Sequence, residues 1–168
     1  MKFVIILSDL RSAHNVGAIF RTADAINAEK IFLCGTTPKP GQPGPLTSLG
    51  STSLAINRAS RDLAKTALNA ENCVAWEYKK RVGDVIKDLK QQGFQIVALE
   101  QDKKAVDIRK FRPKRKTAMI LGYEVKGIGK NVLNKCDKIV YIPMFGKKES
   151  LNVSVAFGVA GYLVKFKS

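Results

Sequence analysis

Residues that could bind or activate a substrate gather in four short segments, each of which follows an apolar run of the chain. They are Asn15, Arg21, Glu100, Gly122, Glu124, Gly127, Ser150 and Asn152. A guanidinium, carboxylates and amides of this kind bind and orient hydroxyl and phosphate groups, and glycine lets a backbone approach a ligand closely. The pattern indicates a polar ligand site assembled from distant parts of the chain.

The glycines do not match a known nucleotide loop. Gly122 and Gly127 have the spacing of a phosphate-binding loop, but Ile128 stands where that motif needs its lysine. Gly127 and Gly129 lack the third glycine of a dinucleotide-binding fingerprint. Neither motif describes the site.

Nucleophilic and metal chemistry are also disfavoured. Ser150 would need a general base, and the only histidine, His14, lies in a different segment without an acid to activate it. The cysteines, Cys34, Cys73 and Cys136, are far apart and form no Cys-x-x-Cys pair. We therefore expect reduced thiols and no metal site.

Alternating strands and helices would position the polar residues. Apolar runs predict strands at 2–7, 30–34, 73–76, 94–99, 117–121 and 138–142, and helical spacing predicts helices at 15–26, 57–68, 82–92 and 150–166. The alternation predicts an α/β fold with a parallel sheet, which residues 1–168 form as a single domain. Ligands of such sheets bind beyond the carboxyl ends of the strands, where the polar residues lie.

Two segments differ from this alternation. Residues 35–53 hold four of the six prolines, and they form either a functional loop or a disordered insertion. The predicted helix at 150–166 is apolar on nearly every side, so we expect it to be buried, with a subunit interface as the place for it.

The charge of the chain indicates a polyanionic partner. Lys and Arg total 29 against 14 acidic residues, a net charge of +15, and they cluster at 79–81 and 103–116. RNA fits such an excess because neutralised phosphates release counterions; the alternative is a generally basic surface. No apolar segment has the length of a membrane span or the pattern of a signal peptide, so we expect a soluble, cytoplasmic protein.

Three motifs in series resemble those of one family. They are Asn15-Val-Gly-Ala-Ile-Phe-Arg21, Leu121-Gly-Tyr-Glu124-Val-Lys-Gly127-Ile, and Ile142-Pro-Met-Phe-Gly146 followed by Ser150-Leu-Asn-Val-Ser-Val-Ala156. In this order they resemble the motifs of SPOUT-class RNA methyltransferases of the SpoU/TrmH branch, over essentially the whole chain. The resemblance implies a Rossmann-like parallel sheet with a C-terminal trefoil knot, a homodimer, and bound S-adenosylmethionine. It implies ribose 2′-O-methylation of tRNA or rRNA; the alternative is a catalytically impaired, knotted RNA-binding protein.

The resemblance also implies roles for single residues. Arg21 matches the catalytic arginine, which acts either as a base or by holding a phosphate and orienting the hydroxyl; its alternative role is a structural salt bridge. The other catalytic candidates are Asn15, Glu124, Ser150 and Asn152. Asn15 or Ser150 would alternatively cap a helix, with Asn152 in a first helical turn.

Backbone groups of the family hold the cofactor at positions that match Leu99, Gly122, Ile142 and Leu151, with Met144 beside them. Tyr123 and Val125 depart from the family, which has a small or amide residue and a glycine at these positions. Tyr123 would crowd the RNA or stack on a base.

Overall fold

In the part of the chain that the structure describes, seven parallel strands form a central sheet in the order β3-β2-β1-β6-β4-β7-β5. The structure is a computed structural model, and it describes residues 1–41 and 51–167. The strands are β1 (Lys2–Ser8), β2 (Lys30–Cys34), β3 (Trp76–Lys79), β4 (Gln95–Leu99), β5 (Val106–Asp107), β6 (Lys116–Leu121) and β7 (Lys138–Tyr141). The predicted α/β class with a parallel sheet is confirmed.

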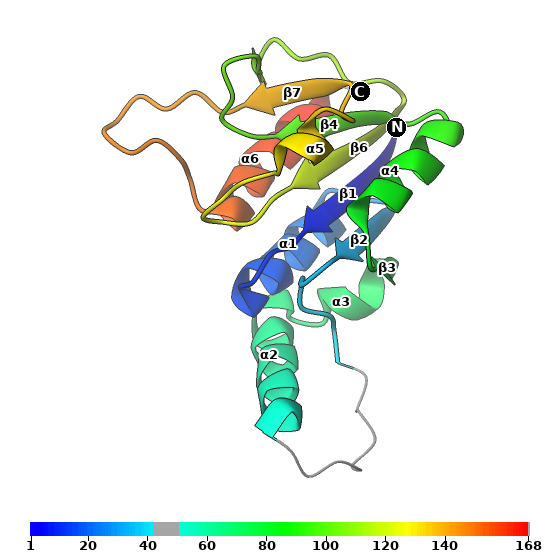
Figure 1. Ribbon diagram of the computed structural model, residues 1–168, viewed down its shortest axis with the longest axis vertical. Coiled ribbons are helices and arrows are strands. Elements are labelled where there is room, and N and C mark those ends of the chain that lie inside the picture. Colours follow the sequence, from blue (N-terminus) through cyan, green and yellow to red (C-terminus); the bar gives the residue numbers. More distant parts are fainter. Residues whose placement is uncertain (42–50, 168) are drawn as a thin grey trace.

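Helices cover both faces of this sheet (Figure 1). They are α1 (Ala13–Ala25), α2 (Ser51–Ala67), α3 (Ala70–Cys73), α4 (Val82–Gln91), α5 (Lys130–Leu133) and α6 (Val153–Phe166). Alternate residues of the strands face opposite sides: Phe3 and Ile5 join the core beneath α1 and α6, whereas Val4 and Ile6 join the core beneath α4. The apolar run of β1 is thus explained by burial on both faces.

Helix α2 packs on α1 rather than on the sheet, and it extends away from the sheet in Figure 1. The contact depends on Gly17, because a Cβ at that position would lie 2.3 Å from the Leu63 carbonyl oxygen. Helix α2 begins at Ser51, earlier than the predicted start near residue 57. Of the predicted 35–53 loop, residues 42–50 lie outside the described residues, and residues 51–53 belong to α2.

Further expectations about the secondary structure need correction. The third strand is Trp76–Lys79, not 73–76, because Cys73 ends α3. The short elements α3, α5 and β5 were not predicted. Helix α1 is capped by Ser12 and not by Asn15, which lies inside the helix; the Ser12 side chain accepts a hydrogen bond from the Asn15 N–H (3.2 Å). Helix α6 is capped by Asn152, so Ser150 is not its cap.

The strand directions separate the basic segments. The carboxyl ends of all strands lie on one edge of the sheet, because every pairing is parallel. Lys116 starts β6 and pairs with Lys2 at the start of β1, so residues 114–116 lie at the opposite edge. The 103–116 segment therefore forms no continuous track along the edge that carries the polar residues. The trefoil knot stays a prediction from the family resemblance.

Candidate active site

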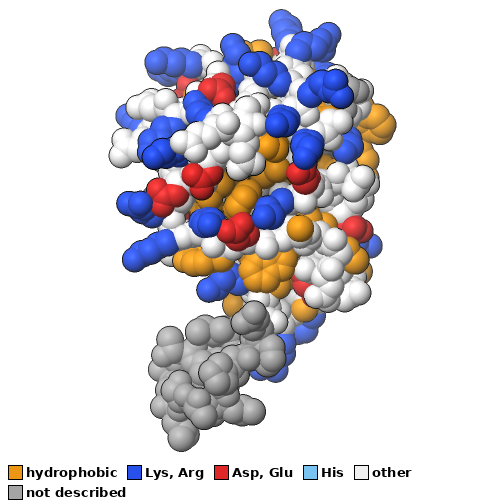
Figure 2. Space-filling model, turned by 90° about the vertical axis from the view of Figure 1, so that its right-hand side faces the viewer, with side chains coloured by type: hydrophobic (Ala, Val, Ile, Leu, Met, Phe, Trp, Pro, Cys, Tyr) orange, Lys and Arg blue, Asp and Glu red, His pale blue; other side chains and the backbone are white. Residues whose placement is uncertain are grey.

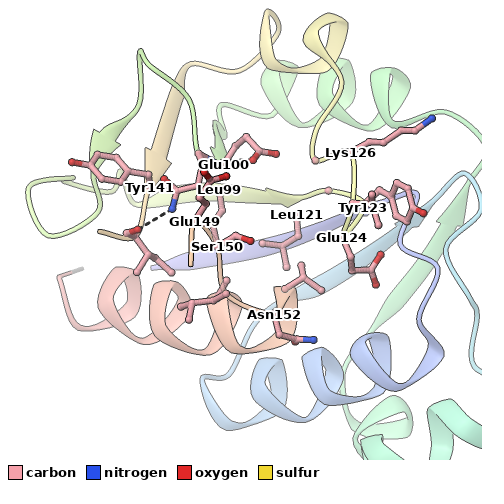
Figure 3. A pocket seen from close by; sticks show the side chains of 18 of the residues that line it. Leu99, Glu100, Leu121, Tyr123, Glu124, Lys126, Tyr141, Glu149, Ser150 and Asn152 are labelled. Carbon is pink, nitrogen blue, oxygen red and sulfur yellow. Dashed lines mark hydrogen bonds between the residues drawn. The ribbon is translucent and has the colours of Figure 1, made fainter. Parts of the chain in front are cut away.

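A pocket lies at the carboxyl ends of β4, β6 and β7 (Figure 3). Its volume is about 360 Å³. Three segments form its walls: residues 99–101 after β4, residues 121–127 after β6, and residues 141–153 with Ala156 after β7. In Figure 3 Tyr123 and Glu124 lie on one side of the pocket and Tyr141 lies on the other.

The turn after β6 is folded tightly against its own start. Gly122 is buried, and a Cβ there would lie 2.7 Å from the Gly127 carbonyl carbon and 2.7 Å from the Ile128 nitrogen. Gly127 has φ of +65°, a conformation that favours glycine, and its N–H donates to the Tyr123 carbonyl (2.8 Å). These two glycines therefore permit a turn that larger residues would open.

Two side chains directly after β4 make hydrogen bonds to the wall segments that follow β6 and β7. The Glu100 carboxylate accepts hydrogen bonds from the Gln101 N–H (2.9 Å) and from the Ile128 N–H (2.7 Å). The Gln101 side chain donates to the Ile142 carbonyl (3.0 Å), which is the dashed line in Figure 3. Glu100 and Gln101 thus join all three walls of the pocket.

A chain of polar contacts borders the pocket on the side of α1. The Asn152 amide donates to the Asn15 side-chain oxygen (3.1 Å), and the Asn15 amide donates to the Glu124 carboxylate (3.0 Å). The same carboxylate accepts from the backbone N–H groups of Ser12 (3.3 Å) and Arg11 (3.4 Å). These contacts bring together residues that lie more than a hundred positions apart, since Asn15 and Glu124 are 109 residues apart.

The contacts also determine the ionisation of Glu124. Burial by itself raises the pKa of this carboxyl, but hydrogen bonds from the Asn15 side chain and from nearby backbone N–H groups lower it more, so the pKa lies below its usual value. Glu124 is therefore an anion at neutral pH. A carboxylate in this state accepts hydrogen bonds and attracts positive charge, and it does not act as an acid.

The structure brings most of the predicted site residues together. All five predicted cofactor residues line the pocket, and so do three of the catalytic candidates. These eight residues are Leu99, Gly122, Ile142, Met144, Leu151, Glu124, Ser150 and Asn152. Asn15 does not line the pocket, but it contacts two residues that do.

Arg21 is the candidate that neither lines the pocket nor makes a side-chain hydrogen bond to a residue that does. It is exposed on α1, six residues after Asn15, which places it about 120° around the helix from Asn15. Within residues 1–41 and 51–167 its side chain makes no hydrogen bond or ion pair. The alternative role as a structural salt bridge therefore finds no partner in this part of the chain.

Several pocket residues were not assigned a role from the sequence. They include Gln101, Lys126, Tyr141 and Glu149. Arg11 does not line the pocket, but its guanidinium lies 4.8 Å from the centre of the ring of Tyr123, which does. The position of Gln101 next to Glu100, directly after a predicted strand, was an available signal. Arg11 gave none, because its contact depends on the fold. The stacked guanidinium occupies one face of Tyr123.

The cysteines take no part in this site. All are free thiols. Burial, together with the nearby Asp9 carboxylate, raises the pKa of Cys34 to about 12, and burial raises the pKa of Cys136 to about 11. Neither is a thiolate nucleophile at neutral pH. Across the described ranges, no group of His, Cys, Asp and Glu could hold a metal ion, and no helix is long and apolar enough to cross a membrane.

A small-molecule pocket at the carboxyl edge of a parallel sheet defines a ligand-binding α/β protein of the doubly wound class. The chain belongs to the SpoU rRNA Methylase family, whose model matches residues 2–162. It is 31% identical to the tRNA (guanosine(18)-2′-O)-methyltransferase of Escherichia coli (strain K12), over 94% of this chain and 60% of that protein. The chain thus spans less than two thirds of the length of this relative.

Solved structures share the fold. An rRNA methyltransferase from Sinorhizobium meliloti with bound AdoMet (S-adenosylmethionine) superposes with a TM-score of 0.80 at 23% identity, over 96% of this chain and 55% of that chain. A protein described in connection with the 2-OH methylation of C/U34 on tRNA gives a TM-score of 0.77 at 23% identity, over 99% of this chain and 95% of that chain. These likenesses confirm the predicted Rossmann-like architecture.

Proposed function

We propose that the protein is an S-adenosylmethionine-dependent methyltransferase that modifies a ribose 2′-hydroxyl of tRNA or rRNA. The observation that supports this function is the composition of the pocket: the five residues that the family resemblance assigns to the cofactor line one cavity, beside Glu124, Ser150 and Asn152. The relatives agree, since one is a tRNA 2′-O-methyltransferase and one holds AdoMet. With these substrates, we also propose that the protein acts in the cytoplasm.

The pocket suits this cofactor chemically. Its volume, about 360 Å³, lies within the roughly 300–1,000 Å³ that is typical of small-molecule sites. Leu121, Met144 and Leu151 offer apolar contact for an adenine ring, and Glu124 and Glu149 offer negative charge for a sulfonium. When bound, S-adenosylmethionine supplies an activated methyl group, so the chain has to align the ribose oxygen rather than activate the methyl.

The polar chain beside the pocket would hold the ribose. Asn152 and Asn15 keep each other and Glu124 in place through their hydrogen bonds, and each amide retains capacity for a hydroxyl. Arg21 would bind the neighbouring phosphate and orient the 2′-hydroxyl. A guanidinium with a pKa above about 12 is a poor base, so we assign Arg21 the positioning role.

We propose that a homodimer completes the site. One face of α6 is buried against α1 and the sheet, but Val155, Val159, Tyr162 and Phe166 are exposed by 52%, 40%, 43% and 81%. Their spacing places them on one side of the helix. The expectation that α6 is buried is therefore met on only one of its faces. A second copy on the open face would cover it, and it would provide a second source of Arg21.

Transfer of a tritiated methyl group from S-adenosylmethionine to RNA tests the function. Bulk tRNA from cells lacking the gene, and rRNA from the same cells, are separate arms. We expect label in one arm, in nucleotides that resist alkaline cleavage because their 2′-hydroxyl is blocked. Label only in alkali-sensitive positions would mean base methylation instead.

Calorimetry distinguishes a methyltransferase from the alternative, a catalytically impaired RNA-binding protein. We expect S-adenosylmethionine to bind, whereas a catalytically impaired RNA-binding protein that has lost the pocket would bind RNA alone. Arg21→Ala should abolish methyl transfer and leave cofactor affinity nearly unchanged. An Arg21→Ala protein with full activity would remove this residue from the mechanism.

A further inference from the structure

A second pocket opens along the same edge of the sheet as the cofactor pocket. It lies beyond the carboxyl ends of β1 and β2, between α4 and α5, and its volume is about 810 Å³. Residues 121–127 line the cofactor pocket, and the α5 segment that follows, including Asn131, Val132 and Lys135, lines the second pocket. One stretch of chain thus separates the two. The second pocket takes no part in the methyl-transfer site described above.

The walls of this second pocket are strongly cationic. Five Lys and Arg side chains line it against two acidic ones; they are Lys80, Arg81, Lys87, Lys90 and Lys135, with Asp9 and Asp84. Figure 2 looks onto the side of the molecule on which α4 lies, where Lys and Arg side chains are spread widely.

Some of these charges already have partners. The Arg81 guanidinium binds Asp84 (2.9 Å), and the Lys90 ammonium binds Asp137 (2.7 Å). Lys87 and Lys135 are exposed and have no acidic partner within residues 1–41 and 51–167. The pocket therefore holds positive charge that the described part of the chain does not neutralise.

The placement of Lys135 strengthens this point. Its Nζ lies 3.0 Å from the position that a Cβ of Gly83 would occupy, in the first turn of α4. The first turn of a helix carries partial positive charge, and α4 has no side-chain cap, since its N-cap is Arg81. An ammonium held against the positive end of a helix is unfavourable, and the acidic residue of that turn, Asp84, is already paired with Arg81. An anion bound beside the Lys135 ammonium would offset both positive charges.

We infer that this second pocket binds phosphate groups of the RNA backbone, and this inference rests on the proposed function. The two pockets meet at the end of β1: Asp9 lines the second pocket, while the Arg11 and Ser12 N–H groups bind Glu124 of the first. RNA whose ribose lies at Glu124 places adjacent phosphates along this edge. Lys87 and Lys135 are the residues that hold them.

Two basic sites in the 103–116 segment do not fit this role. Lys114 and Arg115 line a pocket with Met1 and Lys2 at the opposite edge of the sheet. Arg109 is bound to the buried Asp107 by several hydrogen bonds, one of them 2.6 Å long. Net charge alone would favour these positions equally, whereas the geometry favours the α4–α5 pocket.

The double variant Lys87→Ala/Lys135→Ala tests the inference, with Lys114→Ala/Arg115→Ala as a control of equal charge change at the opposite edge. The affinity for bulk unmodified tRNA is measured by fluorescence anisotropy over a series of salt concentrations. Each lost phosphate contact should reduce the slope of log affinity against log salt by about 1, so the test variant should lose about 2. At about 0.1 M salt its Kd should rise on the order of tenfold or more. The control should keep the wild-type slope.

Folding and cofactor binding are monitored in the same proteins. Circular dichroism and S-adenosylmethionine titration should be unchanged in both variants, and in methyl-transfer assays the KM for RNA should rise in the test variant while kcat stays. Equal losses in test and control variants would overturn the inference, because charge and not the pocket would then bind RNA. An unchanged slope in the test variant would overturn it too. Wild-type protein that binds no RNA would instead overturn the proposed function itself.

Discussion

Replacing Gly122 with alanine should damage the cofactor pocket in a way that the structure quantifies. The added Cβ would lie 2.7 Å from two backbone atoms of the turn, in Gly127 and Ile128, and 2.5 Å from the Ile128 side chain. Carbon atoms in contact are normally about 3.5–4.0 Å apart, so the turn must move outward by roughly 0.8 Å or more. Backbone cannot yield as a flexible side chain does, and overpacking of this kind costs about 1–3 kcal/mol.

The cost should appear in two measurements. The midpoint of thermal unfolding should fall by roughly 2–12 °C, since about 1 kcal/mol corresponds to about 2–4 °C in a chain of this size. S-adenosylmethionine affinity, measured by calorimetry, should fall between about fivefold and 150-fold if the same free energy opposes binding. The moved turn is a wall of the cofactor pocket, which is why both quantities change together.

Gly129→Ala is the matched control. It lies in the same connection, but a Cβ there meets nothing within 4 Å and its φ of −60° suits alanine. Because Gly129 is the N-cap of the short helix α5, and alanine is a poorer N-cap than glycine, the control should lose about 0.5–1 kcal/mol of stability but keep the wild-type affinity for S-adenosylmethionine. If Gly122→Ala unfolds and binds cofactor as the wild type does, the turn is not held at the spacing described, and the reasoning fails.

Three further changes probe the contacts around the pocket. Glu124→Gln should lower stability at pH 7 by up to about 1 kcal/mol. Because the folded pKa is depressed, that difference should vanish in acid unfolding measurements as the pH falls below about 4.3; a difference constant with pH would contradict it. Glu100→Gln leaves one acceptor oxygen where the two carboxylate oxygens accept from the Gln101 and Ile128 N–H groups, so one N–H would face an amide NH2 group. This should cost about 1–3 kcal/mol in chemical denaturation and weaken cofactor binding; an unchanged denaturation midpoint would show that these hydrogen bonds do not hold the pocket together. Val155→Lys on the open face of α6 should give monomers in light scattering. Leu68→Lys, at another exposed apolar position, should leave the oligomeric state unchanged. If both variants are dimers, the open face of α6 is not the dimer interface.

The sequence predicted those parts of the fold that have a strong local cause. The run Phe3 to Leu7 is buried on both sides, so its apolar character is continuous and the strand was evident. The third strand was misplaced because β3 is a short strand at the sheet edge with partly exposed residues, while the apolar residues before it end α3. Strand β5 has two residues, and only its pairing with β7 makes it a strand. Such pairings leave no local pattern.

The site shows the same division. The gathering of polar residues such as Glu100 and Glu124 at one edge of the sheet follows from strand ends that can be read from the sequence. The cofactor positions Gly122 and Ile142 came from the family resemblance, because an apolar strand end by itself does not indicate a cofactor contact. The contact between Asn15 and Glu124 depends on β1 pairing with β6, and spacing along the chain cannot show it. The position of Arg21 was also beyond prediction, because motif membership does not determine which way a side chain on a helix points.

The cofactor pocket has a consequence for synthesis, because every residue of its wall lies at position 99 or later. Strands β1, β2 and β3 can pair with one another early, but β1 reaches β6 only after more than a hundred residues have been made. Until β6 is made, β1 therefore has one unpaired edge, and its free N–H and C=O groups can pair with strands of other chains. A nascent chain that ends before Ser150 cannot yet form the closed pocket, so retention on immobilised S-adenosylmethionine would distinguish completed molecules from unfinished ones.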